Sequence, residues 1–179
     1  MRPFQASLAV LLIGVATTIA PAVLADTGIQ VGVHSGVQLL HDDTLRDENA
    51  PSVGAEARFS FELSPLIVAV GFDHFFIEDR TLLQLDANAL YDLPIGHSFL
   101  YPYLGAGVGL TRFAMPETPD AGNTTDSNGM RMGLNLVGGV RFDHVALPTV
   151  RPFAQAMLTL GPIDLVTIVG GILFELDGH

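Results

Sequence analysis

The stretch Tyr101–Leu110 constrains the fold more than any other, because it alternates two kinds of residue without a break. With a period of two, one face is apolar and the other is nearly bare backbone: Leu104, Ala106, Val108 and Leu110 against Tyr103, Gly105, Gly107 and Gly109. Each glycine inside a helix would cost about 1 kcal/mol relative to alanine, so the stretch is predicted as a strand. A face of glycines leaves space beside the strand for other side chains. A narrow closed barrel requires such space, because its inner wall cannot hold bulky residues on every strand.

Most of the remaining chain shows the same alternation. Turn-rich breaks separate runs with one apolar and one polar or small face, and no helical period is sustained. We predict strands over about 28–40, 53–63, 66–74, 81–93, 101–110, 130–142, 150–160 and 165–176. The segment 116–129, rich in Thr, Asn, Asp and Gly, is predicted as a long polar loop. About eight strands is the smallest number found in bacterial outer-membrane barrels.

The character of the two faces decides which way they point. In a soluble barrel the Leu, Val, Ile and Phe side chains would point inward, and on every strand they would overfill an eight-stranded interior. A β-sandwich could share these apolar faces between two sheets and is the stronger alternative. Its solvated face would normally carry many charges including lysine, whereas the polar face here is mainly Gly, Gln and Asn. We therefore predict an all-β, eight-stranded antiparallel up-and-down transmembrane barrel with its apolar face toward lipid.

Composition narrows the class further. Lys and Arg number 8 against 19 Asp and Glu, which gives a formal net charge of −11, and every basic residue is arginine. This deficit of positive charge argues against a nucleic-acid partner, which requires a basic surface. The absence of cysteine excludes disulfides and thiolate metal sites, and it suits a chain exported through an oxidising periplasm.

The N-terminus has the layout of a secretory signal peptide. Arg2 precedes an apolar run over about 8–20, which is followed by Pro21 and the small-residue site Val23–Ala25. We predict a signal peptide over 1–25 and a barrel domain over 26–179, with export to the outer membrane of a Gram-negative bacterium. An uncleaved membrane anchor is the alternative, but the run is short for a membrane-spanning helix, which needs about 20 apolar residues.

Two motifs carry a family resemblance. Tyr101–Gly109 resembles the P-Y-x-G-A-G-x-G strand of small outer-membrane barrels of the OmpA, OmpX and opacity-protein type, and Arg151–Gln155 is similar to a later strand entry of that family. The resemblance spans roughly 28–176. It implies a monomer surrounded by outer-membrane lipid and lipopolysaccharide. The last strand resembles the signal by which the barrel-assembly machinery recognises its clients, although it lacks a terminal phenylalanine. The family includes adhesins, anchors, narrow pores and a few lipid-modifying enzymes, so the fold does not decide the activity.

Charged residues also fall on the predicted inner face, where an unpaired charge would cost several kcal/mol. We expect them to pair into a polar network that plugs the lumen: Glu56, Arg58, Glu62, Asp73, Asp86, Arg131, Arg141, Arg151 and Glu175. A gated path for small solutes is the alternative, although eight strands leave little room for an open channel. Outward aromatic residues near the ends of even-numbered strands are predicted to form an interfacial girdle: Phe61, Tyr91, Phe142 and Phe174.

The sequence offers little for catalysis. His34 and Ser35 are adjacent and therefore point to opposite faces of a strand, so they cannot form a dyad. No pattern of metal-ligand spacing is present, and we predict no cofactor, no metal and no enzymatic activity. Carboxylates in the acidic stretch 41–51 could share divalent cations with lipopolysaccharide phosphates, or they could simply be solvated. The predicted function is that of a structural or surface-interaction protein whose outer loops could contact a host or surface ligand, with a narrow pore or small-ligand barrel as the alternative.

Overall fold

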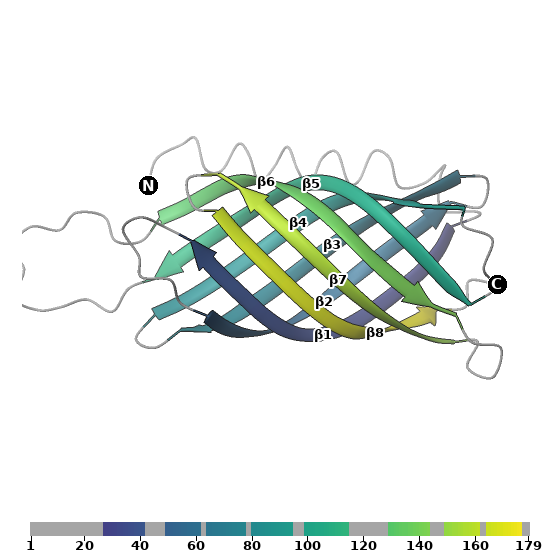
Figure 1. Ribbon diagram of the computed structural model, residues 1–179, viewed down its shortest axis with the longest axis horizontal. Coiled ribbons are helices and arrows are strands. Elements are labelled where there is room, and N and C mark those ends of the chain that lie inside the picture. The colour runs from purple at the N-terminus through teal and green to yellow at the C-terminus, as the bar shows by residue number, and fades with distance from the viewer. Residues whose placement is uncertain are drawn as a thin grey trace, which may run out of the picture.

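The computed structural model is a single sheet closed into a barrel (Figure 1). Each strand pairs antiparallel with the next, and β1 closes the sheet by pairing with β8. The strands are β1 (Thr27–His41), β2 (Asn49–Phe61), β3 (Ser64–Ile77), β4 (Arg80–Asp92), β5 (Leu100–Ala114), β6 (Gly129–Phe142), β7 (Val150–Leu160) and β8 (Asp164–Leu176). The structure describes residues 27–41, 49–61, 64–77, 80–94, 99–114, 129–143, 149–161 and 164–176.

All eight predicted strands are present, which confirms the predicted fold class. No described helix is long and apolar enough to span a membrane. The observed β2 begins at Asn49 rather than 53, because its pairing with β1 continues past Pro51 to the Leu39–Asn49 pair. The signal peptide, the acidic stretch between β1 and β2 and the polar loop between β5 and β6 lie outside the described residues. We call the end of the barrel at which the odd-numbered strands finish the loop end, and the opposite end the turn end; the loop end is on the left in Figure 1.

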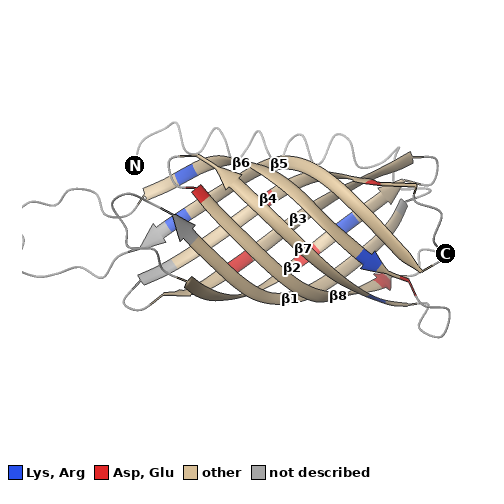
Figure 2. Cartoon of the chain, viewed as in Figure 1, with Lys and Arg blue, Asp and Glu red and all other residues tan. Residues whose placement is uncertain are grey.

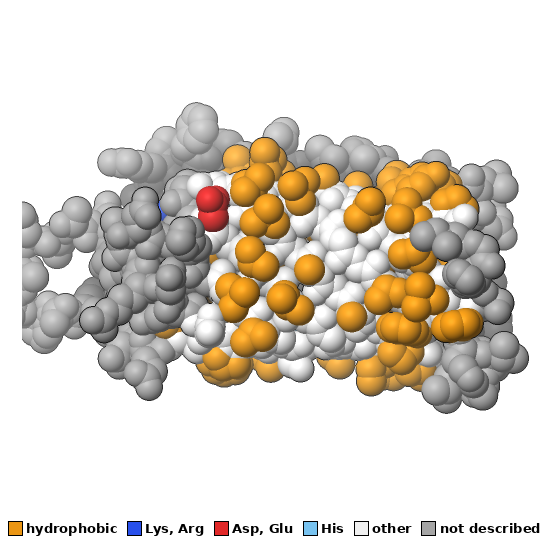
Figure 3. Space-filling model, viewed as in Figure 1, with side chains coloured by type: hydrophobic (Ala, Val, Ile, Leu, Met, Phe, Trp, Pro, Cys, Tyr) orange, Lys and Arg blue, Asp and Glu red, His pale blue; other side chains and the backbone are white. Residues whose placement is uncertain are grey.

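The outer wall is apolar, as the alternation predicts. Val33 on β1, Leu104 on β5 and Leu134 on β6 are 58%, 56% and 63% exposed. Apolar side chains gather toward both ends of the visible wall in Figure 3. A closed single sheet with this outer surface rules out both the sandwich and the soluble barrel, because each would bury its apolar faces.

The predicted aromatic residues lie on this outer wall near the turn end. Tyr91, Phe142 and Phe174 are exposed, and Phe61 is half-buried. Phe72 and Phe76 on β3 are also exposed, at 46% and 52%, and lie toward the loop end. Aromatic side chains therefore lie on the outside toward both ends of the barrel, the arrangement expected of residues at two membrane–water interfaces.

The inner wall is less polar than the sequence pattern predicts. Apolar side chains also point inward and form three buried clusters: Ile67, Ala69, Leu90, Tyr103, Val137 and Met157; Phe153, Val169 and Leu173; and Ala50, Phe75 and Leu82. The first part of β3 shows why the pattern misses them. In Leu66–Val70 both faces are apolar, so no alternation marks Ile67 and Ala69 as inward. The lumen therefore has a polar centre packed between apolar clusters.

Candidate functional site: the lumen network

Glycines on the inner face allow polar side chains from alternate strands to meet. Asn135 on β6 donates a hydrogen bond from Nδ2 to Oδ1 of Asn88 on β4, at 3.0 Å. The strand between them is β5, and the residue paired with both is Gly107. A Cβ at Gly107 would collide with the Asn88 side chain and with the Ala87 carbonyl oxygen. The missing side chain thus gives the two asparagines the space in which to bond.

The same arrangement recurs at Tyr103. Its hydroxyl on β5 donates to Oε1 of Gln155 on β7 at 3.0 Å, across Gly139 of β6. A Cβ at Gly139 would lie 2.5 Å from the Tyr103 hydroxyl oxygen and 2.7 Å from the Ala154 carbonyl oxygen. The tyrosine ring therefore lies against bare backbone, as aromatic residues paired with glycine do in other sheets.

A third pair brings together two residues that can carry charge. His34 Nε2 on β1 lies 2.8 Å from Asp73 Oδ1 on β3, across Gly54 of β2. A Cβ at Gly54 would lie 2.6 Å from that carboxylate oxygen and 2.6 Å from the Phe72 carbonyl oxygen. The glycine-rich inner face noted in the sequence thus has a specific role, which is to permit hydrogen bonds over an intervening strand.

This role predicts opposite outcomes for two glycines on neighbouring strands. Gly107 faces the lumen, so Gly107→Ala should destabilise the barrel by about 1–3 kcal/mol through overpacking and loss of the asparagine pair. Gly138 faces outward, and its added Cβ would meet only the Leu104 side chain at 3.5 Å. Gly138→Ala should therefore leave stability unchanged or raise it slightly, because it restricts the unfolded chain. Urea titration of both variants in lipid vesicles measures the difference, and equal losses would contradict the proposed role of Gly107.

Arg58 is the centre of the network and only 1% exposed. Its Nε donates to Oε2 of Glu56 at 3.0 Å and its Nη2 to Oε1 at 3.1 Å, so the guanidinium holds both carboxylate oxygens. Nη2 also donates to the Tyr103 hydroxyl at 3.1 Å and to Gln155 at 3.4 Å, and the guanidinium lies 4.7 Å from the centre of the Phe153 ring. One side chain from β2 thereby contacts β5 and β7 across the lumen and blocks it.

A second charged cluster lies at the turn end (Figure 2). Arg141 Nη2 donates to Asp92 Oδ2 at 3.1 Å and Arg141 Nε to Asp143 Oδ1 at 3.3 Å. Arg151 lies between Asp143, at 3.7 Å, and Glu175, at 2.5 Å. Arg141 is buried, but its partners and the Arg151 and Glu175 side chains are 22–31% exposed, so this pairing is partly solvated and each pair stabilises the barrel less than the Arg58 pair does.

The structure thus places seven of the nine predicted network residues in two clusters. Glu56, Arg58, Asp73 and Asp86 are buried in the centre, and Arg141, Arg151 and Glu175 lie at the turn end. Arg131 is exposed near the loop end, where β6 begins. Glu62 lies outside the described residues.

Several residues of the two clusters were not predicted from the sequence as members of the network: His34, Asn88, Asp92, Tyr103, Asn135, Asp143, Gln155 and Thr159. Most of them were detectable in principle, because they occupy inward positions of the alternation. Asp143 was not, because it follows the end of β6, where the alternation no longer assigns a side.

The described residues contain no evident catalytic arrangement. His34 points into the lumen and Ser35 is exposed on the outer wall, as their adjacency predicts. Among the residues that the structure describes, no three His, Asp or Glu side chains are placed to hold a metal ion. What the central cluster can do chemically is hold side chains in place, bind a small polar species and restrict the passage of solutes.

The sequence matches no protein-family model and no curated protein sequence. Solved structures do match the barrel. The N-terminal β-barrel domain of Pseudomonas aeruginosa OprF superposes with a TM-score of 0.61 at 13% identity, covering 82% of this chain and 97% of that domain. Neisserial surface protein A gives a TM-score of 0.62 at 19% identity over 84% of this chain and 97% of that chain. The fold is that of the small outer-membrane barrels.

A third structure extends this comparison to the attachment proteins. Ail, the attachment invasion locus protein of Yersinia pestis, gives a TM-score of 0.55 at 17% identity and covers 84% of this chain and 99% of its own. In every case nearly the whole of the solved barrel is matched, so the outer-membrane barrel fold accounts for β1 to β8 as a unit. At these identities the likeness concerns the fold alone, and the side chains that fill the lumen are this chain's own.

Proposed function

We propose that the protein is an integral outer-membrane barrel of a Gram-negative bacterium that acts through its outer surface, as a structural or surface-interaction protein, and that its lumen is a plug. The observation that supports a plug is the position of Arg58, which is 1% exposed and bonded to Glu56, Tyr103 and Gln155 across the lumen. Apolar clusters beside this centre leave no continuous polar path along the described inner wall.

The outer wall supports the proposed membrane location. Exposed Val, Leu, Ile, Met and Phe side chains surround the barrel, and in water a contiguous apolar surface of this kind would cause aggregation. With its N-terminus on the periplasmic side, the barrel turns its loop end, at which β1, β3, β5 and β7 finish, to the cell exterior. The partners that we propose are outer-membrane lipid and lipopolysaccharide, the barrel-assembly machinery during insertion, and a host or surface ligand at the loop end.

The names of two matched proteins support a surface role. One is Neisserial surface protein A, and the other is the attachment invasion locus protein Ail. Ail has also been solved with the heparin analogue sucrose octasulfate. A polysulfated ligand suits the present chain less well, because its formal net charge is −11. A cationic or uncharged partner is the better match for its loops.

A loop deletion and a lumen substitution separate the surface role from the alternative of a narrow pore. Bacteria that display the protein are assayed for attachment to epithelial monolayers, and the refolded protein is assayed for liposome swelling. We expect deletion of 118–128 to reduce attachment several-fold with the barrel still folded, because the segment has few apolar residues that could anchor it. Gln155→Ala, which removes only a lumen contact, should leave attachment unchanged.

The pore alternative predicts the reverse. Wild-type protein would then produce swelling, Gln155→Ala would increase its rate, and the loop deletion would leave it unchanged. We expect no swelling from wild-type protein, because Arg58 and the apolar clusters fill the lumen. If wild-type protein causes liposome swelling and the loop deletion leaves attachment undiminished, the surface role is wrong and transport is the better account. We propose no enzymatic role.

A further inference from the structure

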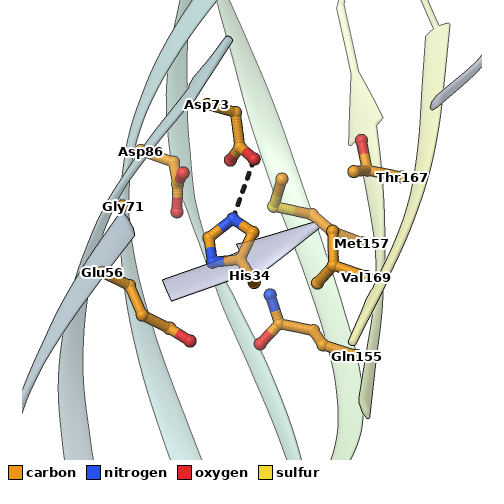
Figure 4. Close-up of a pocket in the computed structure, with 9 residues that line it drawn as sticks. All are labelled: His34, Glu56, Gly71, Asp73, Asp86, Gln155, Met157, Thr167 and Val169. Carbon is orange, nitrogen blue, oxygen red and sulfur yellow. Dashed lines mark hydrogen bonds and ion pairs between the residues drawn. The ribbon is translucent and has the colours of Figure 1, made fainter. Parts of the chain in front are cut away.

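The centre of the lumen contains a small cavity beside the His34–Asp73 pair (Figure 4). Its volume is about 20 Å³, and Glu56 and Asp86 also line it. A cavity needs roughly 10–15 Å³ of such space to hold one water molecule. The cavity therefore accommodates one occupant of about the size of water, and its polar lining makes an empty state unfavourable.

The charges around this cavity do not balance. Glu56, Asp73 and Asp86 are all at most 8% exposed. Arg58 is committed to Glu56 through two hydrogen bonds. Asp86 accepts a hydrogen bond from the uncharged amide of Asn88 and makes no ion pair with any described residue. A buried carboxylate without a counter-charge costs several kcal/mol, so the cavity favours an occupant that is positively charged.

One buried atom shows what kind of occupant fits. The His34 side chain is 6% exposed, and its Nδ1 has no hydrogen-bond partner among the described residues. Figure 4 shows this nitrogen turned toward the space between Glu56 and Asp86, on the opposite side of the ring from Asp73. Because a carboxylate only accepts, Nε2 carries the proton toward Asp73, and in the neutral ring Nδ1 is then an acceptor.

We propose that this cavity binds a water-sized cation that donates hydrogen bonds, the ammonium ion. Such an ion can donate to His34 Nδ1, which has no other partner among the described residues, and it supplies the missing charge beside Asp86. A metal ion fits less well, because no three acidic or histidine side chains in the described strands converge closely enough to bind one. Hard cations also prefer oxygen ligands to an imidazole nitrogen. This site goes beyond the proposed plug, which requires only that the lumen be filled.

Uncharged polar side chains lie on the inner wall between the cavity and the loop end, beside the apolar cluster of Ala50, Phe75 and Leu82. Thr167, which lines the cavity, is paired in register with Gln38, and neither side chain has a hydrogen-bond partner among the described residues. Ser52 on β2 and Gln84 on β4 are likewise buried, and their side chains have no hydrogen-bond partners among the described residues. Buried polar groups of this kind are normally satisfied by water. Toward the turn end, Arg58 and the apolar cluster of Leu90 and Met157 close the cavity.

Thermal unfolding of the full chain in lipid vesicles tests the site. At constant pH and ionic strength, replacing sodium chloride by ammonium chloride should raise the Tm of wild-type protein in proportion to the logarithm of ammonium concentration, because a ligand bound only by the folded state stabilises it. Asp86→Asn keeps the shape of the side chain and removes the excess charge, so it should abolish this rise. If Asp86→Asn does not fold, His34→Gln replaces it as the second variant.

A pH series without ammonium separates binding of the ion from protonation of the groups that line the cavity. The charged or titratable groups facing the cavity are His34 on β1, Glu56 and Arg58 on β2, Asp73 on β3 and Asp86 on β4, while β7 and β8 contribute the uncharged Gln155, Met157, Thr167 and Val169. If Asp86 or His34 takes up a proton instead, acidification should stabilise wild-type protein relative to Asp86→Asn and ammonium should have no effect, an outcome that contradicts the proposal. Equal responses of both proteins to ammonium and to pH would overturn the site. The site would also be overturned if ring ¹⁵N NMR, with the His34 signal assigned by its absence in His34→Gln, shows Nδ1 protonated in every buffer. The imidazolium itself would then balance the charge.

Discussion

Val108→Arg should destabilise the barrel by ~2–4 kcal/mol, the usual cost of a basic side chain on the lipid face at the bilayer midplane. Val108 lies in the middle of β5, points outward and is 45% exposed. Its cross-strand partners, Ala87 on β4 and Leu134 on β6, are also outward, so an arginine there has no polar neighbour in the sheet. Urea titration of protein refolded in lipid vesicles measures the loss directly.

The matched control places the same side chain near the membrane surface. Leu39 is 40% exposed and lies two positions before the end of β1, and the chain's own outward Arg112 lies two positions before the end of β5. Leu39→Arg should therefore cost only about 0–1 kcal/mol, the value for interfacial positions. If the two arginines cost the same, the apolar wall does not face hydrocarbon, and the proposed membrane location is wrong.

This contrast depends on the outer wall, which is the part of the structure that the sequence predicts best. A strict period of two assigns each side chain of Leu104–Leu110 to one face, and lipid selects apolar residues at every outward position. Strand number and order follow from the turn-rich breaks, because a chain of hairpins has little choice of topology. The alternation is weak only where both faces are apolar, as in β3.

The lumen was less predictable, because its contacts depend on register between strands that are not adjacent in sequence. That His34 meets Asp73 requires both to pair with Gly54, and no local pattern reports that alignment. The sequence predicts charge pairing in general, yet Asp73 meets a histidine and Asp86 meets an amide. The inward glycines were the available signal, since each one identifies a place where side chains of the two flanking strands can approach.

Arg58→Met should cost about 3–5 kcal/mol, the usual loss when one partner of a buried ion pair is removed. The methionine fills much of the volume of the arginine stem, so the loss comes mainly from the Glu56 carboxylate, which stays buried and loses both hydrogen bonds from Arg58. Tyr103 and Gln155 keep the bond to each other. Unboiled gel mobility confirms that the variant closes into a barrel, and urea titration gives its stability.

Glu56→Leu combined with Arg58→Met provides the control for this loss. Replacing both members of a buried pair by apolar residues of similar size is often neutral or stabilising, because the cost of desolvating two charges disappears. The double variant should therefore be more stable than Arg58→Met alone. It also removes one of the three carboxylates at the centre of the lumen, and this lowers the repulsion felt by Asp73 and Asp86. If Arg58→Met alone costs less than ~1 kcal/mol, water solvates Glu56, and a lumen that wet is a passage for small solutes rather than a plug.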